Sequence, residues 1–276
     1  MFTLNCRGNI LVIERPIVMG IINVTPDSFF AGSRAQTNDA VLKQAEKMLS
    51  EGATIIDIGG QSTRPGSETI LLDEEVRRVI PAIEIIIKKN PAAIISIDTY
   101  QSSIAKEAIE AGACIVNDIS AGNIDAKMLS TVALLKAPFI CMHMKGTPQL
   151  MQRNPVYENV IREVLDFFIQ KIEECKAAGI HDVIIDPGFG FGKTITDNFQ
   201  LLKNLQVFKM LNKPILAGIS RKSTIYKTLG IPVEEALNGS TVLHTLALQN
   251  GADILRVHDV KEAVEAITLF EKYTLT

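Results

Sequence analysis

The chain has 276 residues, a length that a single α/β-barrel domain commonly fills. Hydrophobic residues make up 47% and charged residues 21%, which excludes a disordered chain and indicates a sizeable buried core. The formal net charge of −3 offers no basic field for nucleic acid or an anionic membrane surface.

The cysteine pattern indicates a reducing compartment. Cys6, Cys114, Cys141 and Cys175 lie far apart and form no C-x-x-C pair, so we expect buried free thiols and neither disulfides nor zinc. The apolar runs are too short to span a bilayer, and residues 1–9 carry no apolar core of a signal peptide. We therefore expect a cytoplasmic protein without membrane contacts.

The first predicted element is a β-hairpin over residues 2–13, FTLNCRGNILVI, which turns at Arg7-Gly8-Asn9. We expect it to plug the bottom of a barrel. After it, a short β-rich run, a polar or glycine-rich stretch and a helical stretch recur in that order. The predicted strands cover residues 17–23, 54–60, 93–98, 114–118, 138–143, 183–186, 214–219 and 254–258.

The predicted helices carry apolar residues three and four positions apart. They cover residues 39–51, 73–89, 102–111, 125–135, 159–178, 198–205, 234–249 and 261–272. Gly52, Gly112, Gly179 and Gly251 follow helix ends as C-caps and lead directly into the next strand.

Strand–helix alternation of this kind predicts a parallel sheet. The strands are continuous apolar runs, as expected when both faces of the sheet are buried. A doubly wound open sheet is the competing arrangement, but eight units in this length favour closure. We predict an α/β fold, a (β/α)₈ TIM barrel with a short N-terminal β-hairpin, as one domain over residues 1–276.

Polar residues end many of these apolar strands. In a barrel such positions converge on the mouth, where the βα loops build the active site. A single one could simply end a strand or cap a helix, but so many on one rim indicate function. The strand-end residues are Asn23, Asp98, Asn117, Asp118, His143, Asp186, Arg256 and His258.

Three of the loops carry further signals. The loops NVTPDSF (23–29) and GGQSTRPG (59–66) are longer than usual βα connections, and we expect them to act as lids that bring Asp27 and Arg64 over the site. The loop DPGFGFGK (186–193) is rich in glycine, but its spacing is not that of a P-loop.

The ends of the seventh and eighth strands predict an anion site. GISRKS (218–223) precedes a helix, and the loops after these two strands commonly bind phosphate in barrels. They supply Arg221, Lys222, Arg256 and His258, and the last two share one strand face. The alternative is that these four side chains only form salt bridges to Asp186 and Asp98. Two carboxylates rarely need four cationic partners, so we favour an anionic ligand.

Taken together, these motifs resemble the dihydropteroate synthases, a family of folate-pathway enzymes. The resemblance runs from MGIINVTPDSF (19–29) to LRVHD (255–259) and includes the loops above, MHMKGTP (142–148) and SRKS (220–223). Gln61 stands where the family pattern leads us to expect Glu, and Phe30-Ala31-Gly32 replaces a more acidic stretch. Both departures lie in the predicted lids.

The resemblance implies a reaction and a set of roles. The family joins 6-hydroxymethyl-7,8-dihydropterin pyrophosphate to p-aminobenzoate with Mg²⁺ and releases pyrophosphate and dihydropteroate. It implies Asn23 as a metal ligand, with Thr63, Arg256 and His258 on the pyrophosphate. The implied catalytic residues are Asp27, Arg64, Lys222, Arg256 and His258. Those expected at the pterin are Asp98, Asn117, Asp186 and Lys222, and Met142, Phe191 and Gly218 are further expected substrate-binding residues.

The second substrate would lie against Phe29, Thr63, Arg64, Pro65 and Ser223, the subsite that sulfonamides mimic in this family. The incoming arylamine is unprotonated at neutral pH, so the reaction needs no strong general base. That suits a chain without an obvious Ser-His-Asp or Cys-His arrangement. From the resemblance we also expect a homodimer, formed through later helices such as residues 234–249.

Two other functions stay open. A methyltetrahydrofolate-dependent methyltransferase shares the barrel and the pterin pocket, but it would not need the TPDSF or SRKS motifs and normally works with a corrinoid partner. A non-catalytic pterin-binding module would not need the full set of charged mouth residues. For the synthase that the resemblance implies, the expected partners are its two small-molecule substrates, with no nucleic acid or membrane.

Overall fold

Strands and helices alternate along the computed structural model, which describes residues 1–24, 34–61, 70–151 and 155–276. The barrel strands are β3 (Ile17–Asn23), β4 (Ile55–Gly59), β5 (Ile94–Asp98), β6 (Ile115–Asp118), β7 (Phe139–Met142), β8 (Val183–Asp186), β9 (Leu216–Ala217) and β10 (Ile254–Val257).

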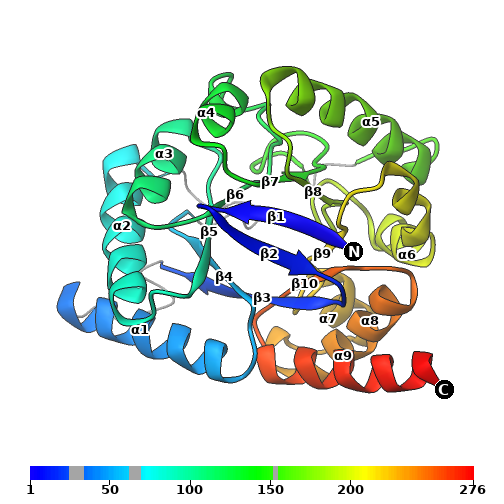
Figure 1. The fold of residues 1–276 in the computed structure, drawn as a ribbon. Helices are drawn as coiled ribbons and strands as arrows, with labels where there is room; N and C mark the ends of the chain where they lie inside the picture. The colour runs from blue at the N-terminus through cyan, green and yellow to red at the C-terminus, as the bar shows by residue number, and fades with distance from the viewer. Residues whose placement is uncertain (25–33, 62–69, 152–154) are drawn as a thin grey trace.

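Helices surround this sheet on its outside (Figure 1). They are α1 (Arg34–Ser50), α2 (Leu72–Lys89), α3 (Ser102–Ala111), α4 (Met128–Leu135), α5 (Val160–Ala178), α6 (Ile195–Lys203), α7 (Ser223–Leu229), α8 (Leu237–Gln249) and α9 (Val260–Leu275), with 3₁₀ turns η1 (Leu205–Leu211) and η2 (Val233–Glu235). No helix in the described ranges combines the length and apolarity needed to cross a bilayer.

The eight strands form one parallel sheet that closes on itself. Its order is β8-β7-β6-β5-β4-β3-β10-β9, so the two ends are β8 and β9. A parallel bridge between Ile185 and Ile215 joins these ends, and the Ile185 amide donates to the Pro214 carbonyl at 3.0 Å. The predicted (β/α)₈ barrel is therefore confirmed, and the open doubly wound sheet is excluded.

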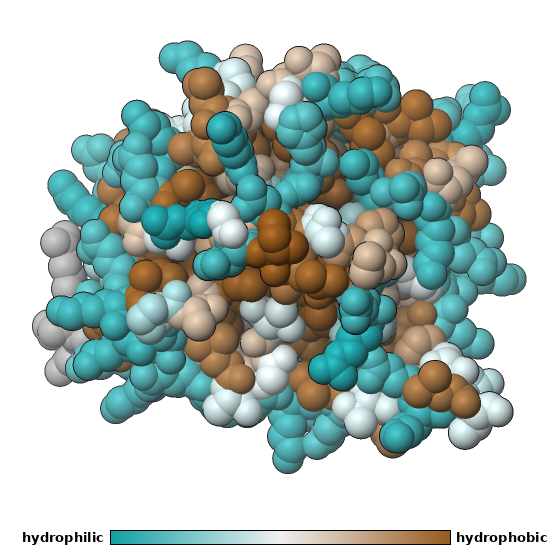
Figure 2. All heavy atoms as spheres, in the orientation of Figure 1, coloured by the Kyte–Doolittle hydropathy of each residue, from teal (hydrophilic) through white to brown (hydrophobic). Residues whose placement is uncertain are grey.

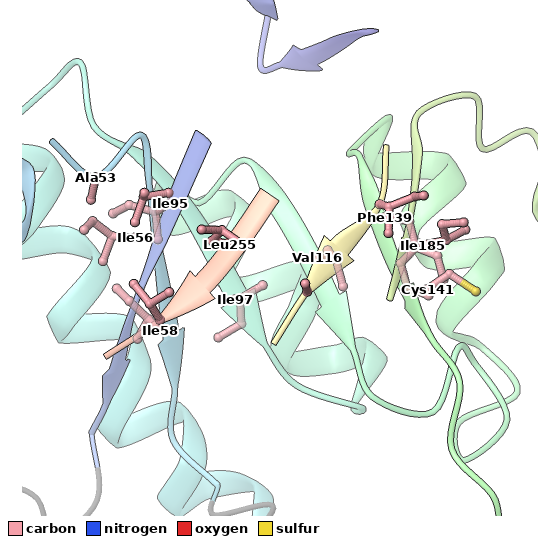
Figure 3. Packing of buried hydrophobic residues seen from close by; sticks show 14 of the residues in the cluster. Ala53, Ile56, Ile58, Ile95, Ile97, Val116, Phe139, Cys141, Ile185 and Leu255 are labelled. Carbon is pink, nitrogen blue, oxygen red and sulfur yellow. The ribbon is translucent and has the colours of Figure 1, made fainter. Parts of the chain in front are cut away.

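Side chains along each strand alternate between two buried layers. One set packs under the helices, where Ile56 and Ile58 of β4 share a cluster with Val79 and Ile83 of α2. Figure 3 shows members of this layer from β4, β5, β6, β7, β8 and β10. The residues between them point into the barrel. This alternation determines which polar side chains at the strand ends face the mouth.

The N-terminal hairpin closes the bottom of the barrel. It consists of β1 (Phe2–Cys6) and β2 (Asn9–Ile13), joined by Arg7 and Gly8 at φ of 55° and 86°, as a type I′ turn requires. Leu4 and Ile13 are buried in one cluster with the first inward residues of the barrel strands. Figure 1 shows the hairpin across this end, and hydrophobic side chains gather over it in Figure 2.

Several element bounds differ from those predicted, and α1 begins at Arg34, five residues before the predicted start at residue 39. The seventh barrel strand spans only Leu216–Ala217 and not residues 214–219. Helix α6 begins earlier, at Ile195, because Thr194 and Asp197 form a reciprocal capping box. The predicted helix 234–249 is divided, since the 3₁₀ turn η2 ends before α8 begins at Leu237.

Candidate active site

The strand register brings polar side chains from distant parts of the sequence into one inward-facing ring. Asn23 pairs with Gly59, Gly59 with Asp98, and Asp98 with Asn117 across β3 to β6. Farther round the barrel, Met142 of β7 pairs with Asp186 of β8. These positions lie at the C-terminal ends of the strands, as predicted.

An arginine and two carboxylates form the centre of this ring. Arg256 donates from Nε to Oδ2 of Asp57 at 2.7 Å and from Nη2 to Oδ2 of Asp98 at 2.5 Å. Both carboxylates raise the pKa of Arg256, although burial alone would lower it. Within the described part of the chain, Nη1 of Arg256 has no partner. The guanidinium therefore keeps its Nη1 amino group for a ligand.

Asp57 is a site residue that the sequence analysis missed. Its side chain is fully buried, and its Oδ2 also accepts a 3.1 Å hydrogen bond from Nδ2 of Asn117. Among the residues that the structure describes, none makes a hydrogen bond to Oδ1. A carboxylate in the middle of the apolar run TIIDIG was the available signal, because a buried strand rarely carries an ionised side chain without a partner.

The carboxylates carry more negative charge than one guanidinium neutralises. Burial raises the pKa of Asp98 to about 7, because the attraction of Arg256 offsets only part of the lost hydration and Asp57 adds repulsion. At neutral pH Asp98 therefore exchanges between its protonated and ionised forms. A ligand that donates N–H groups would shift it toward the carboxylate.

Asp186 and Lys222 form a second charged pair on the opposite side of the mouth. A Cβ atom at Gly218 would lie 3.7 Å from Nζ of Lys222 and 3.8 Å from Oδ2 of Asp186, so the glycine lies beside both groups. Burial raises the pKa of Asp186, against the attraction of Lys222. Burial disfavours the charged form of Lys222 in the same way and lowers the pKa of this lysine to about 8.

The glycine-rich loop after β8 holds this lysine. Nζ of Lys222 donates to the carbonyl oxygen of Phe189 at 2.5 Å and lies 4.7 Å from the centre of the Phe191 ring. Met142 and Phe191 belong to a small apolar cluster with Tyr100. The mouth thus combines an apolar wall with hydrogen-bonding groups, which suits a flat polar ring.

The anion corner is smaller than predicted, because Arg221 is already engaged. Its Nε and Nη2 donate to both oxygens of Asp259 at 2.8 and 2.9 Å, and its Nη1 donates to the carbonyls of Val233 and Glu234. Arg221 thus clamps the chain around α7, and counting it among the anion-binding cations was wrong.

Of the other residues predicted for this corner, His258 is exposed at the end of β10, and its Nδ1 lies 3.2 Å from Oγ of Ser220. Ser223 is the first residue of α7 and is half-buried.

Two strand-end residues face away from the mouth, contrary to expectation. Asp118 follows the inward Asn117 and accepts hydrogen bonds from Ser120 and from the Gly122 amide. His143 follows the inward Met142, and its ring packs edge-on against Phe167 of α5 at 4.9 Å. A shift of one position in a strand turns a side chain to the other face.

The predicted lid residues Asp27, Phe29, Thr63, Arg64 and Pro65 lie outside the described residues. Asn23, predicted as a metal ligand, is half-buried at the end of β3. The described ranges contain no group of three or more His, Cys, Asp or Glu side chains that could hold a metal ion.

Similarity to known proteins extends over nearly the whole chain. A family model described as "pterin binding enzyme" matches residues 19–258. The dihydropteroate synthase of Escherichia coli (strain K12) is 43% identical over 267 residues, which cover 96% of this chain and 94% of the relative.

Solved structures show the same fold. A dihydropteroate synthase of Xanthomonas albilineans with 4-aminobenzoic acid has a TM-score of 0.93 and 42% identity, covering 99% of this chain and 98% of its own. The Yersinia pestis enzyme in a sulfonamide drug complex has a TM-score of 0.92 and 41% identity, covering 99% of each chain.

The shared charge in the central cluster leads to a prediction. In the variant Asp57→Asn, we expect the pKa of Asp98 to fall below its value of about 7, because the repulsion from Asp57 is gone and Arg256 keeps only one carboxylate. Carboxyl ¹³C resonances followed against pH measure this shift. Asp73→Asn, an exposed carboxylate on α2, is the control. An unchanged or higher pKa of Asp98 in Asp57→Asn would show that the two carboxylates are not coupled.

Proposed function

The chain belongs to the dihydropteroate synthase family of pterin-binding enzymes, which transfer a pterinylmethyl group, and we propose which residues of its barrel mouth carry out this reaction. The reaction joins 6-hydroxymethyl-7,8-dihydropterin pyrophosphate to p-aminobenzoate and releases pyrophosphate. The observation that carries the assignment is the ring of inward polar side chains beside the Met142 and Phe191 wall.

The pterin ring is bound by the two sides of the mouth. Asp186 accepts paired hydrogen bonds from the aminopyrimidine N–H edge, and Asp98 and Asn117 reach the other polar edge. Lys222 donates to the ring carbonyl beside Gly218. Met142 and Phe191 lie against the ring face, where they exclude water and strengthen these hydrogen bonds.

Arg256 and His258 bind the pyrophosphate. The guanidinium is fixed by Asp57 and Asp98, so its remaining Nη1 group is held ready for an anion. Pyrophosphate gains negative charge as its bond to the pterin methylene carbon breaks. A donor that meets this charge stabilises the transition state more than the ground state.

Mg²⁺ fits this arrangement as a partner of the pyrophosphate. It usually keeps several waters and binds proteins through one or two oxygen ligands together with substrate phosphates. Asn23 offers one amide oxygen at the end of β3, next to Gly59. When bound, the ion would neutralise part of the charge on the departing pyrophosphate.

The second substrate is p-aminobenzoate, and relatives described with 4-aminobenzoic acid and with a sulfonamide drug support this. We assign its binding to Phe29, Thr63, Arg64, Pro65 and Ser223, of which only Ser223 lies in the described part. Asp27 and Arg64 act from the two lids, and Thr63 also contacts the pyrophosphate. The arylamine attacks the methylene carbon directly, so no side chain needs to remove its proton beforehand.

A cytoplasmic homodimer completes the proposal. All four cysteines are free thiols, as expected in a reducing compartment, and cell fractionation would test the location. Val242 and Leu246 on α8 and Leu269 and Tyr273 on α9 are exposed, and two copies could cover them together. Light scattering that gives the mass of a single chain would exclude the dimer.

A turnover assay tests the function. Pyrophosphate release should require both the dihydropterin pyrophosphate and p-aminobenzoate, and a chelator of Mg²⁺ should stop it. Pterin binding without release would favour a non-catalytic module. Methyl transfer from methyltetrahydrofolate would instead favour the methyltransferase.

Two substitutions should separate binding from catalysis. Asp186→Ala should weaken binding of the pterin alcohol by about 3 kcal/mol, because a buried bidentate pair is lost. Arg256→Gln should lower kcat by about a hundredfold or more while affecting pterin-alcohol affinity less. Arg162→Gln is the control, since this arginine also pairs with a carboxylate, Asp166, but lies on the outer helix α5. Calorimetry and steady-state kinetics measure both effects. Equal losses of turnover and affinity in Arg256→Gln would assign Arg256 a structural role.

A further inference from the structure

Lys193 is a buried cation that the proposed reaction does not use. It ends the glycine-rich loop after β8, and only 3% of its surface is exposed. Its Nζ donates to three backbone carbonyls, of His143 at 3.2 Å and of Gly188 and Phe191 at 3.0 Å each, and lies 2.9 Å from Nδ1 of His143. Within the described residues, no carboxylate is close enough to pair with it.

A cation in this setting is held at a cost in free energy. Burial lowers the pKa of Lys193 to about 7, and burial together with the nearby ammonium lowers the pKa of His143 to about 2. The histidine is therefore neutral. Asp186, Lys222 and Asp197 are the other charged groups whose fields reach Lys193. Buried charges without a paired counter-charge occur more often at functional sites than elsewhere.

The ammonium joins two loops that are pressed together. A Cβ atom at Gly188 would lie 1.9 Å from the carbonyl oxygen of His143, and one at Gly192 would lie 2.3 Å from that of Lys145. Side chains other than glycine therefore do not fit at these positions. The loop is also held by a 2.8 Å hydrogen bond from the hydroxyl of Tyr157 to the Gly192 carbonyl. Lys193 supplies the donors at the centre of this contact.

The same loop contacts Lys222 on its other side. The Phe189 carbonyl accepts a hydrogen bond from Nζ of Lys222, and the Phe191 ring lies beneath that ammonium. The carbonyl of Phe191 is bound by Lys193, so one residue links the two lysines. A displacement of the loop at Lys193 would move the groups that fix Lys222.

We propose that Lys193 is a positioning residue, which fixes the glycine-rich loop so that the Phe189 carbonyl and the Phe191 ring hold Lys222 over the pterin pocket. The inference rests on the proposed role of Lys222 in binding the pterin carbonyl. A small misplacement of such a group can cost about a hundredfold in rate.

A double-mutant cycle tests this role. Lys193→Met keeps the length of the side chain and removes the charge, and it should lower kcat/KM for the pterin substrate by about a hundredfold. In a Lys222→Met background the same change should cost much less, because its route to the substrate is already lost. Lys171→Met is the matched control. That lysine is also nearly buried, but it pairs with Glu174 on α5.

The outcomes are distinct. Non-additive losses with normal kinetics for Lys171→Met support the proposal. Equal losses in both backgrounds, or wild-type turnover in Lys193→Met, overturn it. If Lys193→Met does not fold, Lys193→Arg takes its place in the same cycle, since it keeps the charge but moves the donors.

A measurement without substrate separates this inference from the proposed function. Amide hydrogen exchange at Gly190 and Phe191 should accelerate in Lys193→Met but not in Lys171→Met. Unchanged exchange would overturn the positioning role. Absent turnover in the wild-type chain would instead overturn the proposed function.

Discussion

One guanidinium shared by two buried carboxylates determines the character of the barrel mouth. Arg256 bonds to Asp57 and Asp98, which come from neighbouring strands and would otherwise repel each other in a poorly hydrated space. Burial, with the repulsion from Asp57, outweighs the attraction of Arg256 and raises the pKa of Asp98 to about 7, near its midpoint of protonation at neutral pH. Because the negative charge is partly neutralised, the two carboxylates can be buried without a ligand. Asp98 can still accept hydrogen bonds from a ligand.

Elsewhere in the barrel, apolar inward side chains gather at the bottom and polar inward side chains gather at the mouth. At the bottom, inward side chains such as Ile55 and Ile184 pack with the hairpin residue Leu4. At the mouth, the next inward positions on the same strands are Asp57 and Asp186. Because successive side chains of a strand point to opposite faces, each strand packs its outward residues against the helices. Its inward residues contact the N-terminal hairpin at the bottom of the barrel and line the site at the mouth. The architecture therefore places stability at one end and ligand binding at the other.

Sequence patterns were sufficient for the eight strands, the hairpin and most inward mouth residues, since strand ends in a barrel share one rim. They failed where one position decides the outcome: His143 and Asp118 lie next to inward residues but face the helices. They also failed for partners far apart in the chain. Arg256 and Asp57 are separated by 199 positions, and the engagement of Arg221 by Asp259 depends on the fold of a loop. In the sequence, Lys193 is only the last residue of a loop motif. Most of its hydrogen-bond acceptors are backbone carbonyls, which no particular residue type marks in the sequence.

The protons exchanged on ligand binding test the central cluster most directly. Burial raises the pKa of Asp98 to about 7, so this carboxyl holds part of a proton near neutral pH, and burial also raises the pKa of Asp186. A pterin alcohol that donates N–H groups favours the ionised carboxylates, so its binding should release protons. Calorimetry in buffers of different ionisation enthalpy measures this release, which should diminish as the pH rises above about 8. Proton uptake, or no exchange at any pH, would contradict the assignment of these carboxylates to the pterin.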